Sequence, residues 1–375
     1  MSQTTGTPPV TAPDPSPILR VRDLRIAFDH AAAPAVNGAW LDVHTGQMVA
    51  LVGESGSGKS VTAMSLLGLL PSPPARIERG SALFRSASHV AHGRVVDLLT
   101  LDAAAMRSIR GREIAMIFQE PMTSLNPVMT IGDQIIETIQ LHARIDRAAA
   151  RTRAAVALSE VGIADAARRL GQYPHEFSGG MRQRVMIAMA LACRPSLLLA
   201  DEPTTALDVS VQAQILDLLG EARRTRGMGV LFITHDLGIV AQHADVVCVM
   251  YAGRIVEAAT VFDLFDAPRH PYTRALLQCV PRLGVRAERL SNVHEAIHAA
   301  DGPAAIPGHG ALAWWPSQRP RGLAAVSGDD SVMVQAAPGH WVRAWRTPDI
   351  VIEGPSLPAF VRGGASAKEG EPCAS

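Results

Sequence analysis

The sequence contains few cysteines and no long apolar run. Four cysteines are spread over 375 residues, at positions 193, 248, 279 and 373, and none belongs to a Cys-x-x-Cys pair or a Cys/His cluster. This spacing indicates neither a disulfide framework nor a zinc site, and it favours a reducing compartment. No stretch of 18 apolar residues occurs, so the sequence predicts no membrane-spanning helix.

An excess of charge of either sign is also absent. Lys+Arg and Asp+Glu number 35 each, which argues against nucleic acid as the main partner. The length predicts two domains, or one large domain with an appendage, and a hydrophobic content of 47% is enough for a substantial core. Residues 1–17 lack a basic start followed by an apolar stretch and contain five prolines. We therefore expect a disordered tail there, not a secretion signal.

The apolar pattern predicts several strands. Apolar and polar residues alternate over 18–28 and 36–43, as in half-buried strands. Short apolar runs at 48–53, 196–201 and 229–236 are typical of strands that are buried on both faces of a parallel sheet.

Helical segments alternate with these strands. Helical spacing covers 60–70, 133–170 and about 208–225, and residues 244–259 resemble a hairpin that turns at Ala252-Gly253-Arg254. The alternation predicts an α/β fold with a parallel sheet, to which an antiparallel start and a helical insertion at about 124–183 are added.

The periodicity fades after about residue 283, where Pro, Gly, Ala and His become frequent. We therefore predict three parts: the tail at 1–17, a main domain at 18–283 and a C-terminal extension at 284–375.

A glycine-rich segment follows the predicted strand at 48–53. GESGSGKS matches G-x-x-x-x-G-K-[ST], with a strand before it and a helix after it. Glycines let backbone N–H groups converge on phosphate oxygens, the lysine reaches the terminal phosphates, and the serine can bind Mg²⁺. The predicted phosphate-binding residues are Gly53, Glu54, Ser55, Gly56, Ser57, Gly58, Lys59 and Ser60.

A second buried strand ends in two acidic residues, in SLLLADEP. It delivers Asp201 to the carboxyl edge of the sheet, where Asp201 is expected to hold Mg²⁺, and Glu202 is placed to polarise an attacking water. No N-K-x-D motif for reading guanine is present, which favours an ATPase over a GTP-binding switch.

Four further segments resemble the motifs of ABC-type ATPases in order and spacing. FSGGMRQR (177–184) resembles the signature segment, with Phe177 in place of its usual leucine, and IFQEP (117–121) resembles the glutamine loop. TALD (205–208) resembles the D-loop, and ITHD (233–236) contains the switch histidine. The resemblance covers about 18–283. It implies a P-loop NTPase (RecA-like) core with an antiparallel β subdomain, a helical signature subdomain and a small C-terminal extension.

The same resemblance implies how ATP is bound. In this family two cassettes dimerise head to tail, so the signature of one copy faces the ATP held by the phosphate loop of the other. Ser178, Gly179 and Gly180 would therefore contact a γ-phosphate on the partner, from a helix N-terminus that suits an anion. Ser178 is also expected to cap its own helix.

Four single residues acquire roles by position. Gln119 would contact Mg²⁺ and the lytic water and sense a transmembrane partner, and His235 would hold the γ-phosphate and orient Glu202. Asp208 would link the two sites across the dimer. Phe28 is placed to stack on adenine, although an aromatic residue in an alternating strand is equally expected in the core.

A narrower resemblance to the ATPase subunits of dipeptide/oligopeptide importers rests on three segments: 119–135, 173–219 and HPYTRALL (270–277). Nickel importers share much of this pattern, so a peptide solute is implied by resemblance alone. The implied partners are integral membrane permease subunits, a second cassette and, indirectly, an extracytoplasmic solute-binding protein, and the implied location is peripheral, at the cytoplasmic face of the inner membrane. A soluble ABC ATPase remains the competing class.

The C-terminal extension resembles that of this family only in part. AAIPGHG (304–310) and GHWVRAW (339–345) match its ends, but no cysteine occurs from 280 to 372, so an iron–sulfur cluster that such cysteines could hold in relatives is not carried over. The histidines are too scattered to argue for a metal, and Trp314 and Trp315 are expected to pack rather than form a site.

Overall fold

The computed structural model describes residues 16–86, 94–119, 124–204, 209–279, 304–306, 310–312, 315, 331–345, 355 and 357. The predicted tail at 1–17 falls almost entirely outside this part of the chain, as does the predicted boundary at 283/284. Both boundaries stay predictions.

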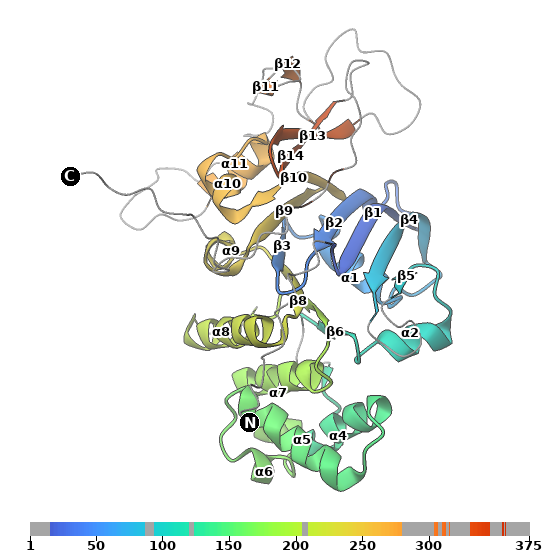
Figure 1. Ribbon diagram of the computed structural model, residues 1–375, viewed down its shortest axis with the longest axis vertical. Coiled ribbons are helices and arrows are strands. Elements are labelled where there is room, and N and C mark those ends of the chain that lie inside the picture. Colours follow the sequence, from blue (N-terminus) through green and yellow to red (C-terminus); the bar gives the residue numbers. More distant parts are fainter. Residues whose placement is uncertain are drawn as a thin grey trace, which may run out of the picture.

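A central sheet of eight strands organises the molecule, in the order β13-β14-β10-β9-β3-β8-β7-β6 (Figure 1). Its parallel strands are β3, β6, β7, β8 and β9, and β10, β14 and β13 continue it antiparallel. The bounds are β3 Met48–Val52, β6 Ile114–Ile117, β7 Leu197–Asp201, β8 Gly229–Thr234, β9 Val246–Tyr251, β10 Arg254–Thr260, β13 Ser331–Ala337 and β14 His340–Trp345.

A second, antiparallel sheet of four strands, in the order β2-β1-β4-β5, lies beside the central sheet. Its strands are β1 Leu19–Phe28, β2 Val36–Val43, β4 Ala75–Arg85 and β5 Val95–Asp97. A short pair, β11 Ala304–Ile306 and β12 Gly310–Leu312, forms a third sheet. The strands predicted from apolar patterning are therefore present, and the hairpin of β9 and β10 turns at Ala252 and Gly253, both at positive φ.

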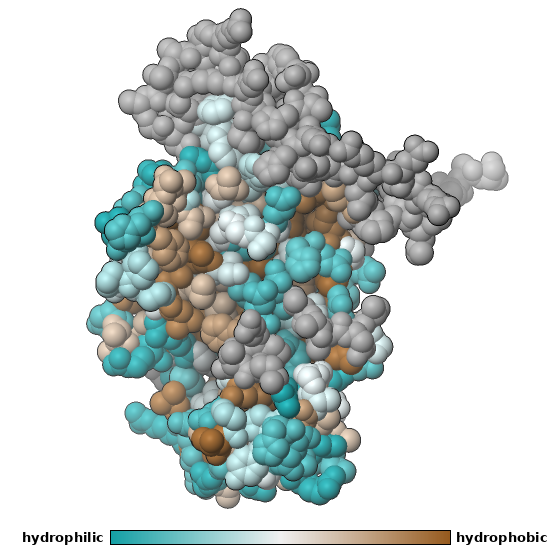
Figure 2. Space-filling view, turned by 180° about the vertical axis from the view of Figure 1, so that it is seen from behind, coloured by the Kyte–Doolittle hydropathy of each residue, from teal (hydrophilic) through white to brown (hydrophobic). Residues whose placement is uncertain are grey.

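Helices cover the central sheet and form a separate lobe. In the described part of the chain four helices and a 3₁₀ turn make up this lobe, at the lower end of Figure 1: α4 Ile131–His142, α5 Arg147–Glu160, α6 Ala166–Arg169, η1 Pro174–Glu176 and α7 Gly179–Leu191. The other helices whose bounds lie within the described residues are α1 Lys59–Leu66, α2 Ala103–Ile109, α8 Val209–Arg226, α9 Leu237–His243, α10 Val261–Asp266 and α11 Pro271–Gln278. Seen from behind, the lobe is mostly hydrophilic with isolated hydrophobic residues (Figure 2).

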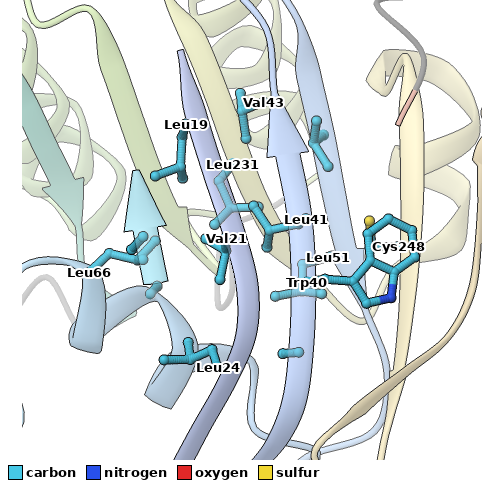
Figure 3. Close-up of a cluster of buried hydrophobic side chains, with 14 of the residues drawn as sticks. Leu19, Val21, Leu24, Trp40, Leu41, Val43, Leu51, Leu66, Leu231 and Cys248 are labelled. Atoms are coloured by element: carbon cyan, nitrogen blue, oxygen red, sulfur yellow. The ribbon is translucent and has the colours of Figure 1, made fainter. Parts of the chain in front are cut away.

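The core divides at the central sheet because its strands are apolar on both faces. On β8, Leu231 and Ile233 face the antiparallel sheet, whereas Val230 and Phe232 pack with the helical lobe. Figure 3 shows the first cluster, where side chains from β1 and β2 meet Leu51, Leu231 and Cys248. This packing fixes the carboxyl edge of the parallel strands, where the predicted site residues lie.

Candidate functional site

The phosphate loop joins the end of β3 to the start of α1, as the sequence predicts. Gly58 has φ +105°, and a Cβ built on it would lie 2.4 Å from the carbonyl oxygen of Ala35. A Cβ on Gly53 would lie 2.1 Å from the carbonyl oxygen of Met250. Contacts this close exclude any side chain at either position, so the backbone of the loop lies tightly against β9 and the residue that precedes β2.

Lys59 folds back over this loop. Its Nζ donates to the carbonyl oxygens of Gly53 at 2.8 Å and Glu54 at 2.7 Å, and lies 3.3 Å from the Ser57 hydroxyl. Burial lowers the pKa of Lys59, and the carboxylates of Glu202, Asp201 and Glu54 oppose that shift. Phosphate oxygens can replace these carbonyl oxygens as hydrogen-bond acceptors. They would place a full negative charge beside the buried ammonium group of Lys59 and so stabilise its charged form.

Two of the three residues predicted to contact Mg²⁺, Ser60 and Asp201, are hydrogen-bonded to each other. The Ser60 hydroxyl donates to Asp201 Oδ1 at 3.0 Å, although the two residues are 141 positions apart in the chain. Burial raises the pKa of Asp201, and the hydrogen bond from Ser60 opposes that shift. Mg²⁺ prefers oxygen ligands, and a hydroxyl oxygen and a carboxylate oxygen lie side by side here. Because Mg²⁺ usually keeps several of its waters, two protein ligands at this place fit the ion.

Glu202 lies between two of the other predicted residues. Gln119 Nε2 donates to one carboxylate oxygen at 3.2 Å, and His235 Nδ1 lies 3.3 Å from the other. Glu202 has φ +45°, an uncommon conformation for a residue other than glycine. Its backbone N–H donates to the carbonyl oxygen of Ile233 at 3.0 Å, which helps to hold it in this conformation.

These residues converge because their strands are parallel. Gln119 follows β6, Asp201 ends β7 with Glu202 directly after it, His235 follows β8, and the phosphate loop follows β3. The carboxyl ends of adjacent parallel strands meet at one edge of the sheet, which is where open α/β sheets bind ligands. The structure therefore gathers the phosphate loop, the acidic pair, the glutamine and the histidine at one place.

The signature segment is located at the N-terminus of α7. The Ser178 side chain accepts from the backbone N–H of Met181 at 3.4 Å, which confirms the predicted cap. A Cβ on Gly179 would meet nothing within 4 Å, so the first turn of the helix is open to a ligand. In the described part of the chain no hydrogen bond joins Ser178 to the phosphate loop of the same copy, and its contact with a partner's ATP stays a prediction.

The roles of the predicted site residues stay predictions, and for Phe28 and Asp208 the described residues show no contact with the others. Phe28 ends β1 half-buried against the core cluster between the sheets, which leaves its stacking on adenine a prediction. Asp208 lies outside the described residues, and so does Trp314. Trp315 packs as predicted, with the Arg254 guanidinium 5.1 Å from its ring centroid and Tyr251 6.4 Å away.

Sequence reasoning missed one residue of the phosphate loop's surroundings. The Tyr272 hydroxyl, on α11, accepts from the backbone N–H of Glu54 at 3.0 Å. The one sequence signal for it is the His-Pro-Tyr triplet within 270–277, which contributes to the family resemblance but suggests no role for the tyrosine. Among the described residues no cluster of three or more His, Cys, Asp or Glu side chains could hold a metal, and no helix is long and apolar enough to cross a membrane.

Comparison with known proteins points to one family. The profile of the ABC transporter family matches residues 36–205, and that of the oligopeptide/dipeptide transporter C-terminal region matches 256–303. The chain is 56% identical over 274 residues to a putative peptide import ATP-binding protein of Brucella melitensis, covering 72% of this chain and 80% of the relative.

Other relatives and solved structures agree. A probable peptide ABC transporter ATP-binding protein of Sinorhizobium fredii is 48% identical over 89% of this chain and 96% of its own length. A dipeptide transport ATP-binding protein of Bacillus subtilis is 49% identical, over 74% and 80%. An ATP-binding cassette solved as a dimer with ADP and Pi shares the fold, with a TM-score of 0.56 at 24% identity over 65% of this chain and 98% of that one. The predicted fold class is confirmed.

Proposed function

Because the chain belongs to the ABC transporter family, in the branch of peptide import ATP-binding proteins, we propose that the site on the carboxyl edge of its sheet hydrolyses ATP to drive peptide import. The chain is an ATPase of a peptide importer, and membership of the family implies a membrane permease and a second cassette as partners. The residue roles below, the magnesium ion and the remaining partners belong to the proposal.

The proposal rests on one observation: Lys59, Asp201 and Glu202 lie together at one edge of the sheet. There the lysine can bind phosphate, the aspartate can bind Mg²⁺ and the glutamate can accept a proton from water. Lys59 and the amides of the phosphate loop bind the phosphates, because both supply N–H donors in a buried setting. Mg²⁺, when held by Ser60 and Asp201, supplies positive charge that offsets the negative charge of the β- and γ-phosphates.

Glu202 acts as the general base in this proposal. Its carboxylate accepts a proton from the water that attacks the γ-phosphate. His235 keeps the carboxylate in place through the 3.3 Å contact of its Nδ1, and Gln119 does so from the other side through its amide. Both contacts leave Glu202 held from two strands, so that its position depends on where β6 and β8 lie.

The second half of the site comes from another copy or from a different cassette. Ser178, Gly179 and Gly180 begin α7, and the space around Gly179 is open, so this helix N-terminus suits the γ-phosphate bound by a partner. Gln183, one turn along the same helix, donates to the carbonyl oxygen of Pro203 and so connects α7 to the segment after Glu202. Binding of ATP at one copy therefore favours closure of the dimer.

Docking of the permease is assigned to a groove beside Gln119. This groove, of about 290 Å³, lies between the central sheet and the helical lobe. It is lined mainly by apolar residues, among them Leu67, Leu69, Met116, Phe118, Met186 and Met189. Phe118 is 41% exposed and precedes Gln119, so a permease helix seated here can move the glutamine and Glu202 with it. The chain would then lie at the cytoplasmic face of the membrane, with a solute-binding protein delivering peptides from the other side.

The substitution Glu202→Gln tests the chemistry. The amide keeps the shape of the carboxylate and loses its basicity, so we expect ATP hydrolysis to fall by at least about 100-fold while ATP binding persists. Gel filtration with ATP should then show a trapped dimer. Glu160→Gln, on the exposed surface of α5, is the control and should hydrolyse ATP at the wild-type rate. A Glu202→Gln variant with wild-type turnover would remove Glu202 from the mechanism.

Affinity purification of the tagged chain from gently solubilised membranes tests the assembly. Co-purification of two multi-span membrane proteins and a second cassette would support the importer and its heteromeric form. Recovery without any membrane protein would instead favour a soluble ABC ATPase.

A further inference from the structure

The His-Pro-Tyr triplet at 270–272 begins α11 in a fully buried position. His270 and Tyr272 are both 0% exposed. The His270 ring caps its own helix, because Nδ1 accepts from the backbone N–H of Tyr272 at 3.2 Å. Its Nε2 must then carry the proton, and it lies 2.5 Å from the carbonyl oxygen of Trp315. The neutral ring thus uses both nitrogens to fix one backbone segment to another.

At its far end the triplet reaches the phosphate loop. The Tyr272 hydroxyl accepts from the Glu54 N–H at 3.0 Å. Burial raises the pKa of Tyr272, so the hydroxyl stays neutral, and its ring packs on Tyr251 with centroids 4.6 Å apart. Phenylalanine would fill the same space without a polar atom to satisfy, so the hydroxyl serves the Glu54 amide.

At its near end the triplet is tied to the C-terminal hairpin of β13 and β14. Glu257 on β10, 0% exposed, accepts from the backbone N–H groups of Arg269 at 2.7 Å and His270 at 2.9 Å. His340, the first residue of β14, places its Nε2 2.7 Å from Glu257 Oε1. The hairpin also pairs with β10 directly, through Glu257 with Val342 and Ala258 with Trp341.

We propose that His270, Tyr272 and Glu257 form a tether through which the C-terminal hairpin positions the phosphate loop. Holding the Glu54 N–H on Tyr272 fixes the start of the loop, so that the amides that follow stay converged on the phosphates. Tyr272 is a positioning residue, and it touches no reacting atom. The tether rests on the proposed binding of ATP by this loop and assigns to the C-terminal hairpin a control over that affinity.

Two substitutions in the same helix separate the tether from ordinary packing. Tyr272→Phe removes only the hydroxyl, and Thr273→Val removes a neighbouring buried hydroxyl that has no hydrogen-bond partner among the described residues. In the nucleotide-free chain, hydrogen exchange at Glu54 should become roughly two- to tenfold faster in Tyr272→Phe, the range expected for one lost neutral hydrogen bond. Thr273→Val should exchange as the wild type does.

The affinity of the same variants for ATP is the second measurement that tests the tether. The Kd for ATP should rise by roughly the same two- to tenfold in Tyr272→Phe, with kcat at saturating ATP near the wild-type value. A wild-type chain that fails to bind ATP would defeat the proposed function. If the wild-type chain binds ATP but hydrogen exchange at Glu54 is unchanged in Tyr272→Phe, the tether is refuted and the proposed function stands.

A double-mutant cycle tests whether the effect comes from the hairpin. His340→Leu removes the donor to Glu257 at similar volume and should speed exchange at Glu54 in the wild-type background. In the Tyr272→Phe background it should have no further effect there, because the tether is already cut. His340→Gln restores a donor and should restore slow exchange. Equal effects of His340→Leu in both backgrounds, or no effect in either, would overturn the proposal.

Discussion

The buried ion pair of Arg223 and Asp245 allows a sharp test of what holds the nucleotide-binding edge. Asp245 is 0% exposed, its Oδ2 is bound by Arg223 from α8, and it also accepts from the backbone N–H of Met48 at 2.7 Å. Met48 begins β3, the strand that leads into the phosphate loop. Arg223→Met would leave a carboxylate buried without its cation, a change that costs about 3–5 kcal/mol of unfolding free energy. Because Met48 still donates, we expect a loss of about 3 kcal/mol.

Urea denaturation of the nucleotide-free chain, followed by far-UV circular dichroism, measures this loss. For an m-value of about 3 kcal/mol per molar urea, the midpoint should fall by about 1 M. Arg226→Met is the matched control, since Arg226 lies one turn along α8 and pairs at 2.8 Å with Glu160, whose side chain is 42% exposed. An exposed pair of this kind contributes at most about 1 kcal/mol.

The double variant Arg223→Met/Asp245→Asn removes both charges and should recover most of the loss. Equal midpoints for Arg223→Met and Arg226→Met would refute the reasoning, because burial would then make no difference to the cost of breaking the pair.

Two further predictions concern the loop and its tether. Gly58→Ala should abolish measurable ATP binding in a calorimetric titration, because its Cβ would lie 2.4 Å from the Ala35 carbonyl oxygen. Gly56→Ala has open space around it, and its φ of +78° should cost only about 1 kcal/mol of folding free energy. Burial lowers the pKa of His270 to about 4, with the nearby Glu257 carboxylate opposing the shift. The unfolded chain therefore binds a proton first as pH falls, so stability present above about pH 6.5 should decline toward pH 4, by on the order of 3 kcal/mol. Urea midpoints at pH 7.5, 6 and 5 check this decline, and His270→Asn should flatten it.

The elements at the site were predictable because local signals coincide there. The runs that became β3, β7 and β8 are apolar on both faces, and each ends at a motif residue, so their edge could be inferred without coordinates. The phosphate loop was recognisable for the same reason, since Gly58 and Lys59 are fixed by local backbone chemistry.

The contacts around the tether were not predictable, because they join residues far apart in the chain. Glu54 and Tyr272 are separated by 218 positions, and nothing near either residue indicates the other. Leu357 donates from its backbone N–H to Asp42, 315 positions away, at 3.2 Å. The weak periodicity after residue 283 likewise concealed that residues 331–345 extend the central sheet.

The late position of β14 in the chain has a consequence for synthesis on the ribosome. The hydrogen-bonding edge of β10 stays open until about 80 further residues have been made, because its partner begins only at His340. An open edge offers N–H and C=O groups to any other strand. A nascent chain stalled after α11 would therefore carry a nearly complete cassette whose β10 edge can pair with other strands. We expect such fragments to be substrates for chaperones or proteases.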